Sequence, residues 1–201
     1  MLTVDAEKAN YPQEDESLIS EVPKNIHVHT TKTSDPYVIY SLFGRKAPSS
    51  GFANESVQGV SGYVKKLARF IRGNVFIPDP RKGWNKFAIK KAAELIKTHG
   101  LETIITTSPP HSTQLIGLEL KKKYGVKWVA DMRDPWTKIY YVSELLQTKW
   151  AQNKNANLER TVLENADSVI TVSQSLASEF CELAPRLKPE NIEVISNGFD
   201  E

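Results

Sequence analysis

The sequence predicts an α/β fold built on a doubly wound parallel sheet. Two short runs of apolar and β-branched residues, 104–107 and 126–132, enclose an amphipathic helical segment. A strand–helix–strand unit of this length is a crossover connection, so its two strands are parallel. Strands and helices then alternate to the end of the chain, which is typical of doubly wound sheets. The 201 residues, 40% hydrophobic and 25% charged, are enough for one α/β domain with a substantial core.

The segments before residue 60 are short and rich in turn residues. Leu2–Val4 resembles the end of a strand, and residues 25–30 alternate like a strand that follows a helical turn near residues 17–21. Residues 31–58 contain scattered Pro, Gly and Asn, which predict a long loop.

Two helices are expected before the central unit. Apolar residues at Val60, Val64, Leu67, Ala68 and Ile71 share one helical face, which predicts a helix over residues 60–72 that ends at Gly73. Residues 74–81 should form an extended turn. A second helix is expected over residues 84–98, with Gly100 as its C-terminal signal.

The second half of the chain continues the alternation. It predicts a helix over residues 143–165, a strand over 168–172, a helix marked by Leu176, Phe180 and Leu183, and a strand over 192–195. The last strand ends at Asn197-Gly198.

Polar residues gather where the two central strands end, and open α/β sheets bind ligands at the carboxyl ends of their strands. His111 follows two prolines after the first strand. Ser108 or Ser112 can cap the next helix and leave backbone N–H groups facing the crevice, which suits an anionic or hydroxyl-rich ligand. The same residues are equally compatible with a plain capped turn and a surface histidine.

The second strand ends in a denser polar group, Asp131, Arg133, Asp134 and Trp136. A guanidinium binds carboxylate or phosphate, and an indole offers a face for a sugar or base. The alternative is an internal Arg–Asp pair with Trp136 in the core. We expect His111 to share a solvent-open pocket with Arg133, Asp134 or Trp136, with Asn197 on the same rim and Arg133 paired to Asp131 or Asp134.

Charge and cysteine content narrow the possible partners. The net charge of +2 favours no nucleic-acid partner, and the single Cys181 excludes an internal disulfide framework and fits a reducing cytoplasm. No run of residues has the length and apolarity of a membrane span.

The helix predicted at 60–72 has an apolar face and, opposite it, four basic residues, Lys65, Lys66, Arg69 and Arg72. It is either a membrane-surface helix that binds anionic lipid or an ordinary core helix with solvated lysines.

Five motifs in order resemble the amino-terminal domain of a GT-B glycosyltransferase of the retaining family-four type. They are IPDPRKGW, TSPPHSTQLIG, VADMRDPW, LERTVLENADSVITVSQS and VISNGFD, and they run from about residue 74 to residue 201. The resemblance implies two Rossmann-like domains across a cleft. The first binds the acceptor, the second binds a nucleotide-sugar, and no metal or other cofactor is needed.

The resemblance also implies roles for single residues. His111 would reach the donor sugar, Arg133 and Asp134 would line the acceptor side, and residues 196–201 would form the hinge to a carboxyl-terminal domain. The family's first strand and Gly-rich loop are expected before Leu2, and its donor-binding domain after Glu201. Residues 1–201 are therefore expected to be one incomplete Rossmann-like domain, inactive by itself.

The expected function is sugar transfer from a nucleotide-sugar to a hydroxyl acceptor with retention, in surface polysaccharide or glycolipid synthesis. The expected place is the cytoplasm, at the cytoplasmic membrane face. A non-catalytic ligand-binding module on the same fold is one alternative. A metal-dependent hydrolase using His27, His29, His111 and Asp131 is another.

Overall fold

The strands form two parallel sheets in the computed structural model, which describes residues 1–9, 21–34 and 62–198, except for the side chains of Val64, Lys65 and Tyr141. One sheet pairs β1 (Leu2–Val4) with β2 (His29–Thr31). The other has the order β3 (Thr103–Ser108), β4 (Lys127–Met132), β5 (Ser168–Thr171) and β6 (Ile192–Val194). The predicted α/β class and the parallel pairing of the two central strands are confirmed.

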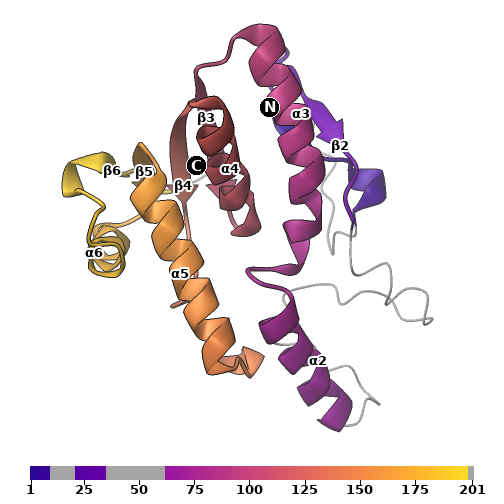
Figure 1. Cartoon of the computed structure of the whole chain (residues 1–201), viewed down its shortest axis with the longest axis vertical. Coiled ribbons are helices and arrows are strands. Elements are labelled where there is room, and N and C mark those ends of the chain that lie inside the picture. The colour runs from indigo at the N-terminus through magenta and orange to yellow at the C-terminus, as the bar shows by residue number, and fades with distance from the viewer. Residues whose placement is uncertain (10–20, 35–61, 199–201) are drawn as a thin grey trace.

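Helices separate the strands along the chain (Figure 1). The α-helices are α2 (Gly62–Val75), α3 (Asn85–His99), α4 (Ser112–Tyr124), α5 (Lys149–Asn165) and α6 (Gln174–Leu183). Short 3-10 helices are η1 (Ala6–Lys8), η3 (Pro80–Trp84), η4 (Tyr140–Leu145) and η5 (Pro189–Asn191). Gly100 and Gly125 end α3 and α4 at φ of 60° and 67°, a backbone conformation that glycine adopts without steric cost.

The main core lies on one face of the four-stranded sheet. Trp128, Ala130 and Met132 alternate along β4 and are fully buried. They pack in one cluster with residues of three helices, Leu118 of α4, Val162 and Leu163 of α5, and Leu176 and Phe180 of α6. Crossovers of the same hand between neighbouring parallel strands place their helices on the same side of a sheet. α4, α5 and α6 therefore cover one face.

A second core cluster lies on the outer side of α4. There α3 packs against α4 through Ala88, Ile96, Ile116 and Leu120, together with Val126. On the main-core side of α4, Gly117 lies so close to the Trp128 indole that a side chain there would overlap the ring. Because Gly117 has no side chain, α4 packs closely against β4.

The N-terminal strand differs from its prediction. The alternation at 25–30 is shifted in the structure, because the three-residue β1 pairs only with His29–Thr31. Val28, predicted to lie inside this strand, precedes it and is exposed. The helical turn near 17–21 and the predicted loop at 31–58 fall largely outside the described residues, although Thr31 belongs to β2.

Gly73 does not end its helix, contrary to the prediction. α2 continues to Val75 because Gly73 serves packing: a Cβ at this position would overlap the carbonyl of Leu145. Asn74 follows in the same helix, so residues 74–81 do not form one extended turn.

The long helix predicted at 143–165 is two elements. η4 ends at Leu145, Leu146 turns the chain at φ of 46°, and α5 begins at Lys149. Thr148 sets this start, because its side chain accepts a hydrogen bond from the N–H of Ala151.

Candidate functional site

His111 lies at the carboxyl edge of β3, in a small cavity rather than at the surface. The residue is 5% exposed, and neither ring nitrogen has a hydrogen-bond partner in the part of the chain that the structure describes. Its ring stacks on Trp136 at 5.3 Å between centroids, with 9° between the planes. Burial lowers the pKa of His111 from 6.5 to about 4, so the ring is neutral at pH 7.

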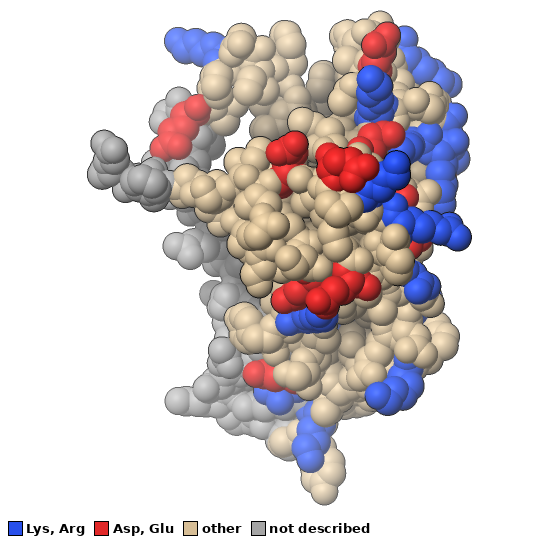
Figure 2. All heavy atoms as spheres, turned by 90° about the vertical axis from the view of Figure 1, so that its left-hand side faces the viewer, with Lys and Arg blue, Asp and Glu red and all other residues tan. Residues whose placement is uncertain are grey.

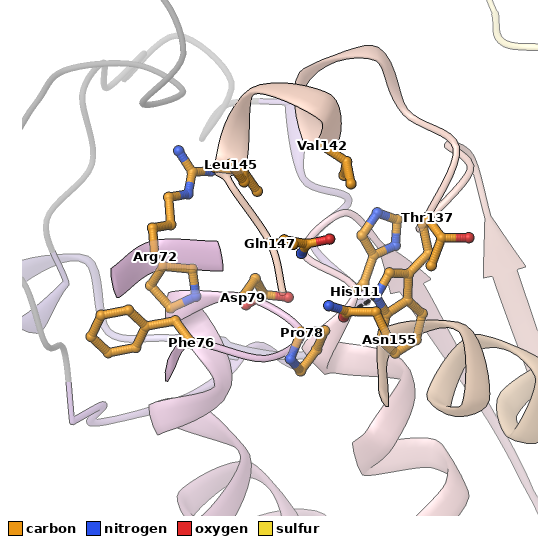
Figure 3. Close-up of a pocket in the computed structure, with 12 residues that line it drawn as sticks. Arg72, Phe76, Pro78, Asp79, His111, Thr137, Val142, Leu145, Gln147 and Asn155 are labelled. Atoms are coloured by element: carbon orange, nitrogen blue, oxygen red, sulfur yellow. Dashed lines mark hydrogen bonds between the residues drawn. The ribbon is translucent and has the colours of Figure 1, made fainter. Parts of the chain in front are cut away.

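The cavity has a volume of about 40 Å³, enough for one or a few water molecules. Figure 3 shows the His111 ring among Val142, Thr137 and Gln147. The lining comes from α2, the segment between α2 and η3, the start of η3, the turns after β3 and β4, η4, the link from η4 to α5, and α5 itself. It consists of Arg72, Phe76, Pro78, Asp79, Pro80, His111, Trp136, Thr137, Val142, Leu145, Gln147 and Asn155.

Two residues of α5 hold Trp136 in place. Asn155 Oδ1 accepts a hydrogen bond from the indole N–H at 3.1 Å (dashed in Figure 3), and Glu159 accepts one from the Trp136 backbone N–H at 2.9 Å. Glu159 also accepts from the N–H and hydroxyl of Thr137. Burial raises the pKa of the Glu159 carboxyl, although these hydrogen bonds oppose the shift. The ring against which His111 stacks is thus fixed from a neighbouring helix.

The N-terminus of α4 is already occupied by a carboxylate of the protein. Asp79 accepts hydrogen bonds from the Ser112 N–H at 2.7 Å and the Ser112 hydroxyl at 2.8 Å, as well as from the Arg81 N–H at 2.9 Å. Burial raises the pKa of Asp79, and the bonds from Ser112 work against that shift. The expectation that Ser112 and the helix N-terminus face an open crevice is therefore wrong.

Ser108 is fully buried and does not cap α4. Its hydroxyl donates to the Asp131 carbonyl at 3.4 Å and accepts from Gln114 Nε2 at 3.0 Å. Gln114 also donates to the Asp131 carbonyl at 2.8 Å and accepts from the Thr106 hydroxyl at 2.6 Å. This buried network joins the ends of β3 and β4, so Ser108 acts within the fold and not at the cavity.

A second polar group lies at and beyond the ends of β4 and β6. Arg133 Nε lies 3.1 Å from Asp131 Oδ2, and Arg133 Nη1 donates to Asn197 Oδ1 at 2.7 Å. The expected pairing of Arg133 with Asp131 is confirmed. Asp131 Oδ1 is buried and has no hydrogen-bond partner among the described residues. Asp131 alternates with Ala130 and Met132, so it points to the sheet face that α4, α5 and α6 leave uncovered.

The expected pocket is confirmed in part, because Trp136 lines the cavity together with His111. It was expected to be open to solvent, whereas His111 is buried in it. Arg133, Asp134 and Asn197 do not line it. Asp134 is half-buried in the turn after β4. The reason is the alternation of side chains along β4, which sends Asp131 to one face while the turn carries Trp136 back toward α5.

The four residues of the metal-hydrolase alternative do not come together. Within the described residues no group of three or more His, Cys, Asp or Glu side chains could hold a metal ion, and all four residues lie in that part.

No helix among the described residues is long and apolar enough to cross a bilayer. Cys181 is a free cysteine and is partly buried.

Sequence reasoning missed Asp79, Asn155 and Glu159 as residues that shape the site. Asp79 had a signal, since Asp-Pro before a turn is a common helix cap. Asn155 and Glu159 are four residues apart in a predicted helix, which places them on one face. Nothing in the sequence pattern links that face to Trp136.

Comparison with known proteins gives one family. The sequence pattern of Glycosyltransferase Family 4 matches residues 35–201, which is most of the chain and begins before the first of the five motifs. No protein of curated function matches the sequence. With the parallel α/β fold and a family match over most of its length, the chain belongs to Glycosyltransferase Family 4.

Proposed function

We propose that this chain is the amino-terminal, acceptor-side domain of a retaining glycosyltransferase of the GT-B type. It would work with a carboxyl-terminal domain that binds the nucleotide-sugar, and residues 196–201 would lead into that domain. The acceptor is a hydroxyl compound in surface polysaccharide or glycolipid synthesis, and the enzyme acts without a metal or other cofactor. The enzyme is cytoplasmic and works at the cytoplasmic membrane face.

The observation that supports the proposal beyond the family match is the buried ring of His111, whose two nitrogens have no hydrogen-bond partner among the described residues. A buried polar atom without a hydrogen bond costs free energy, and such atoms in native proteins call for a specific explanation. A ligand hydroxyl that reaches the cavity would supply the partner. Because the ring is neutral, one nitrogen accepts from a hydroxyl and the other donates, which suits a sugar better than an anion.

The cavity holds one or two polar atoms rather than a whole sugar ring, so His111 would contact the edge of a substrate. Trp136 stacks on His111 and limits its rotation. Arg133, Asp131 and Asn197 form a separate polar surface, where the exposed guanidinium of Arg133, held by Asp131 and Asn197, can donate to a substrate hydroxyl. We assign this surface to the acceptor side, with Asp134 next to it. Catalysis is positioning together with electrostatic stabilisation of the departing diphosphate by the second domain.

The test compares the full-length gene product with its His111→Ala variant. Nucleotide release in the presence of acceptor should fall at least about tenfold, because the variant loses a polar contact that is made in the transition state. His99→Ala, at an exposed position at the end of α3, is the matched control and should keep wild-type turnover. Equal rates for His111→Ala and wild type, or a product with inverted anomeric configuration, would contradict the proposal.

The 201 residues alone should not turn over any nucleotide-sugar, since half a cleft cannot hold both substrates. Incubation with a panel of nucleotide-sugars and acceptors checks this. Sustained, acceptor-dependent release of nucleotide would show that these residues carry more than the acceptor side. A non-catalytic binding module would instead leave the full-length product inactive as well.

A further inference from the structure

Helix α2 exposes a row of apolar side chains. Tyr63, Leu67 and Phe70 are spaced i, i+4 and i+7, so they lie on one side of the helix, and they are 87%, 59% and 43% exposed. A single exposed apolar residue is ordinary, but an aligned row on one helix marks an interaction surface. We call Tyr63, Lys66, Leu67 and Phe70 the α2 row.

The helix is nevertheless anchored firmly at its other end. Gly73 packs against the Leu145 carbonyl, and Asn74 donates to the carbonyl of Leu146 at 3.2 Å and accepts from the Thr148 N–H at 2.8 Å. Ala68 and Ile71 are half-buried. The α2 row is therefore held outward by a fixed attachment to η4 and α5.

The charge of α2 has one sign. The helix contains four basic residues and no acidic one, and Lys66 is exposed within the α2 row. Arg69 and Arg72 of the same helix are partly buried. By contrast, acidic and basic side chains are interspersed on the face that carries α5, α6 and β6 (Figure 2). The surface that pairs with α2 should thus be both apolar and anionic.

More apolar surface lies at the same end of the molecule. α2 and the first turn of α5 both lie at the lower end in Figure 1, joined through Asn74 and Thr148. Here Leu146 and Trp150 are 48% and 60% exposed, and Lys154 lies over the Trp150 ring at 4.6 Å. Trp and Tyr beside Lys are the residues that favour the boundary between lipid and water.

We propose that the α2 row docks on an anionic lipid bilayer, with Tyr63, Leu67 and Phe70 entering the headgroup region and Lys66 meeting lipid phosphates. Arg72 and Phe76, at and just beyond the end of α2, line the His111 cavity. The bilayer would thus lie beside the candidate site, which, given the proposed transferase function, makes a membrane-resident acceptor the substrate class. The docking proposal itself depends only on the exposed apolar and basic side chains, and not on the transferase function.

The test measures co-sedimentation of the protein with vesicles of phosphatidylcholine, with and without phosphatidylglycerol. Binding should require the anionic lipid and weaken as salt rises. The double change Leu67→Ser and Phe70→Ser should weaken it at least about tenfold, and Lys66→Ser about fivefold. Ile105→Ser, 65% exposed on β3, and Lys122→Ser, exposed on α4, are the matched controls and should bind like wild type.

Two results would overturn the docking proposal. One is vesicle binding that does not differ between the α2-row variants and wild type. The other is self-association, seen by sedimentation velocity, that the same variants abolish, which would make a second copy of the chain the occupant. Circular dichroism checks that each variant is folded. Because the assay contains neither donor nor acceptor, its failure would leave the transferase proposal standing.

Discussion

At the scale of single residues, His111 shows how burial sets chemistry. An exposed histidine is partly charged near neutral pH, but removal from water disfavours the imidazolium and lowers the pKa of His111 to about 4. Trp136 covers one face of the ring, and Asn155 and Glu159 fix Trp136 in turn. The sequence places His111 at the end of a strand, whereas its charge state depends on α5, more than forty residues away along the chain.

This burial predicts a pH dependence of stability. The folded-state pKa of His111 lies below its ordinary value of 6.5, so the unfolded chain binds more protons between pH 6.5 and about 4. The contribution of the neutral His111 ring to the free energy of unfolding is fully present above pH 6.5 and is lost as pH falls toward 4. Relative to His111→Leu, which cannot titrate, wild type should lose about 3 kcal/mol of unfolding free energy over this range.

Urea unfolding of both proteins at a series of pH values measures the difference. All other titrating groups are common to the two proteins, so their contributions cancel in the comparison. Parallel curves for wild type and His111→Leu from pH 7 to pH 4 would mean that the His111 ring is accessible to water.

At the scale of elements, the joint between α2 and η4 depends on one missing side chain. Gly73 sits inside α2, where glycine is a poor helix former, yet it lets the backbone of η4 approach. At Gly62, the start of the same helix, an added Cβ would have no neighbour within 4 Å among the described residues. The two glycines therefore form a matched pair.

Gly73→Ala should destabilise the joint by about 1–3 kcal/mol, because a Cβ would overlap a backbone carbonyl that cannot move freely. Gly62→Ala should be neutral or stabilising by up to about 1 kcal/mol, since alanine favours the helix. Hydrogen exchange of the α2 amides together with thermal unfolding checks both variants. If Gly73→Ala protected α2 better than wild type, the close contact with Leu145 would be refuted.

At the scale of the whole molecule, the four-stranded sheet is covered unequally. α4, α5 and α6 pack on the face that carries Trp128, while Ile105 on the opposite face is 65% exposed. Its neighbour Ile104 is partly buried and contacts both core clusters. Adjacent residues of one strand thus face a core and water.

Lysine substitutions should distinguish the two faces of β3. Ile105→Lys is expected to change stability by less than about 0.5 kcal/mol, as for other surface changes. Ile104→Lys should cost more than about 3 kcal/mol, because it places a charge within the core. The melting temperatures of the two variants measure this difference, and similar losses in both would mean that the exposed face is covered in solution.

Much of the fold could be predicted because its signals are local. The parallel pairing of β3 with β4 follows from strand and helix lengths, and the end of α3 follows from Gly100. The pairing of Arg133 with Asp131 was also predictable, since the two residues are close in sequence and opposite in charge. In each case the deciding neighbours lie a few residues away or in the next element.

The remaining features depended on residues that are distant in sequence. The sequence predicts a helix end at Gly73, but Leu145 packs against this glycine. It predicts that Ser112 is available to a ligand, but Ser112 is hydrogen-bonded to Asp79. It is compatible with an exposed His111, but Trp136 stacks on the ring. The sequence by itself determined the α/β class, the crossover and the set of polar residues at the strand ends. Only the tertiary structure decided which of them meet, because burial and contact between elements depend on packing that no local pattern encodes.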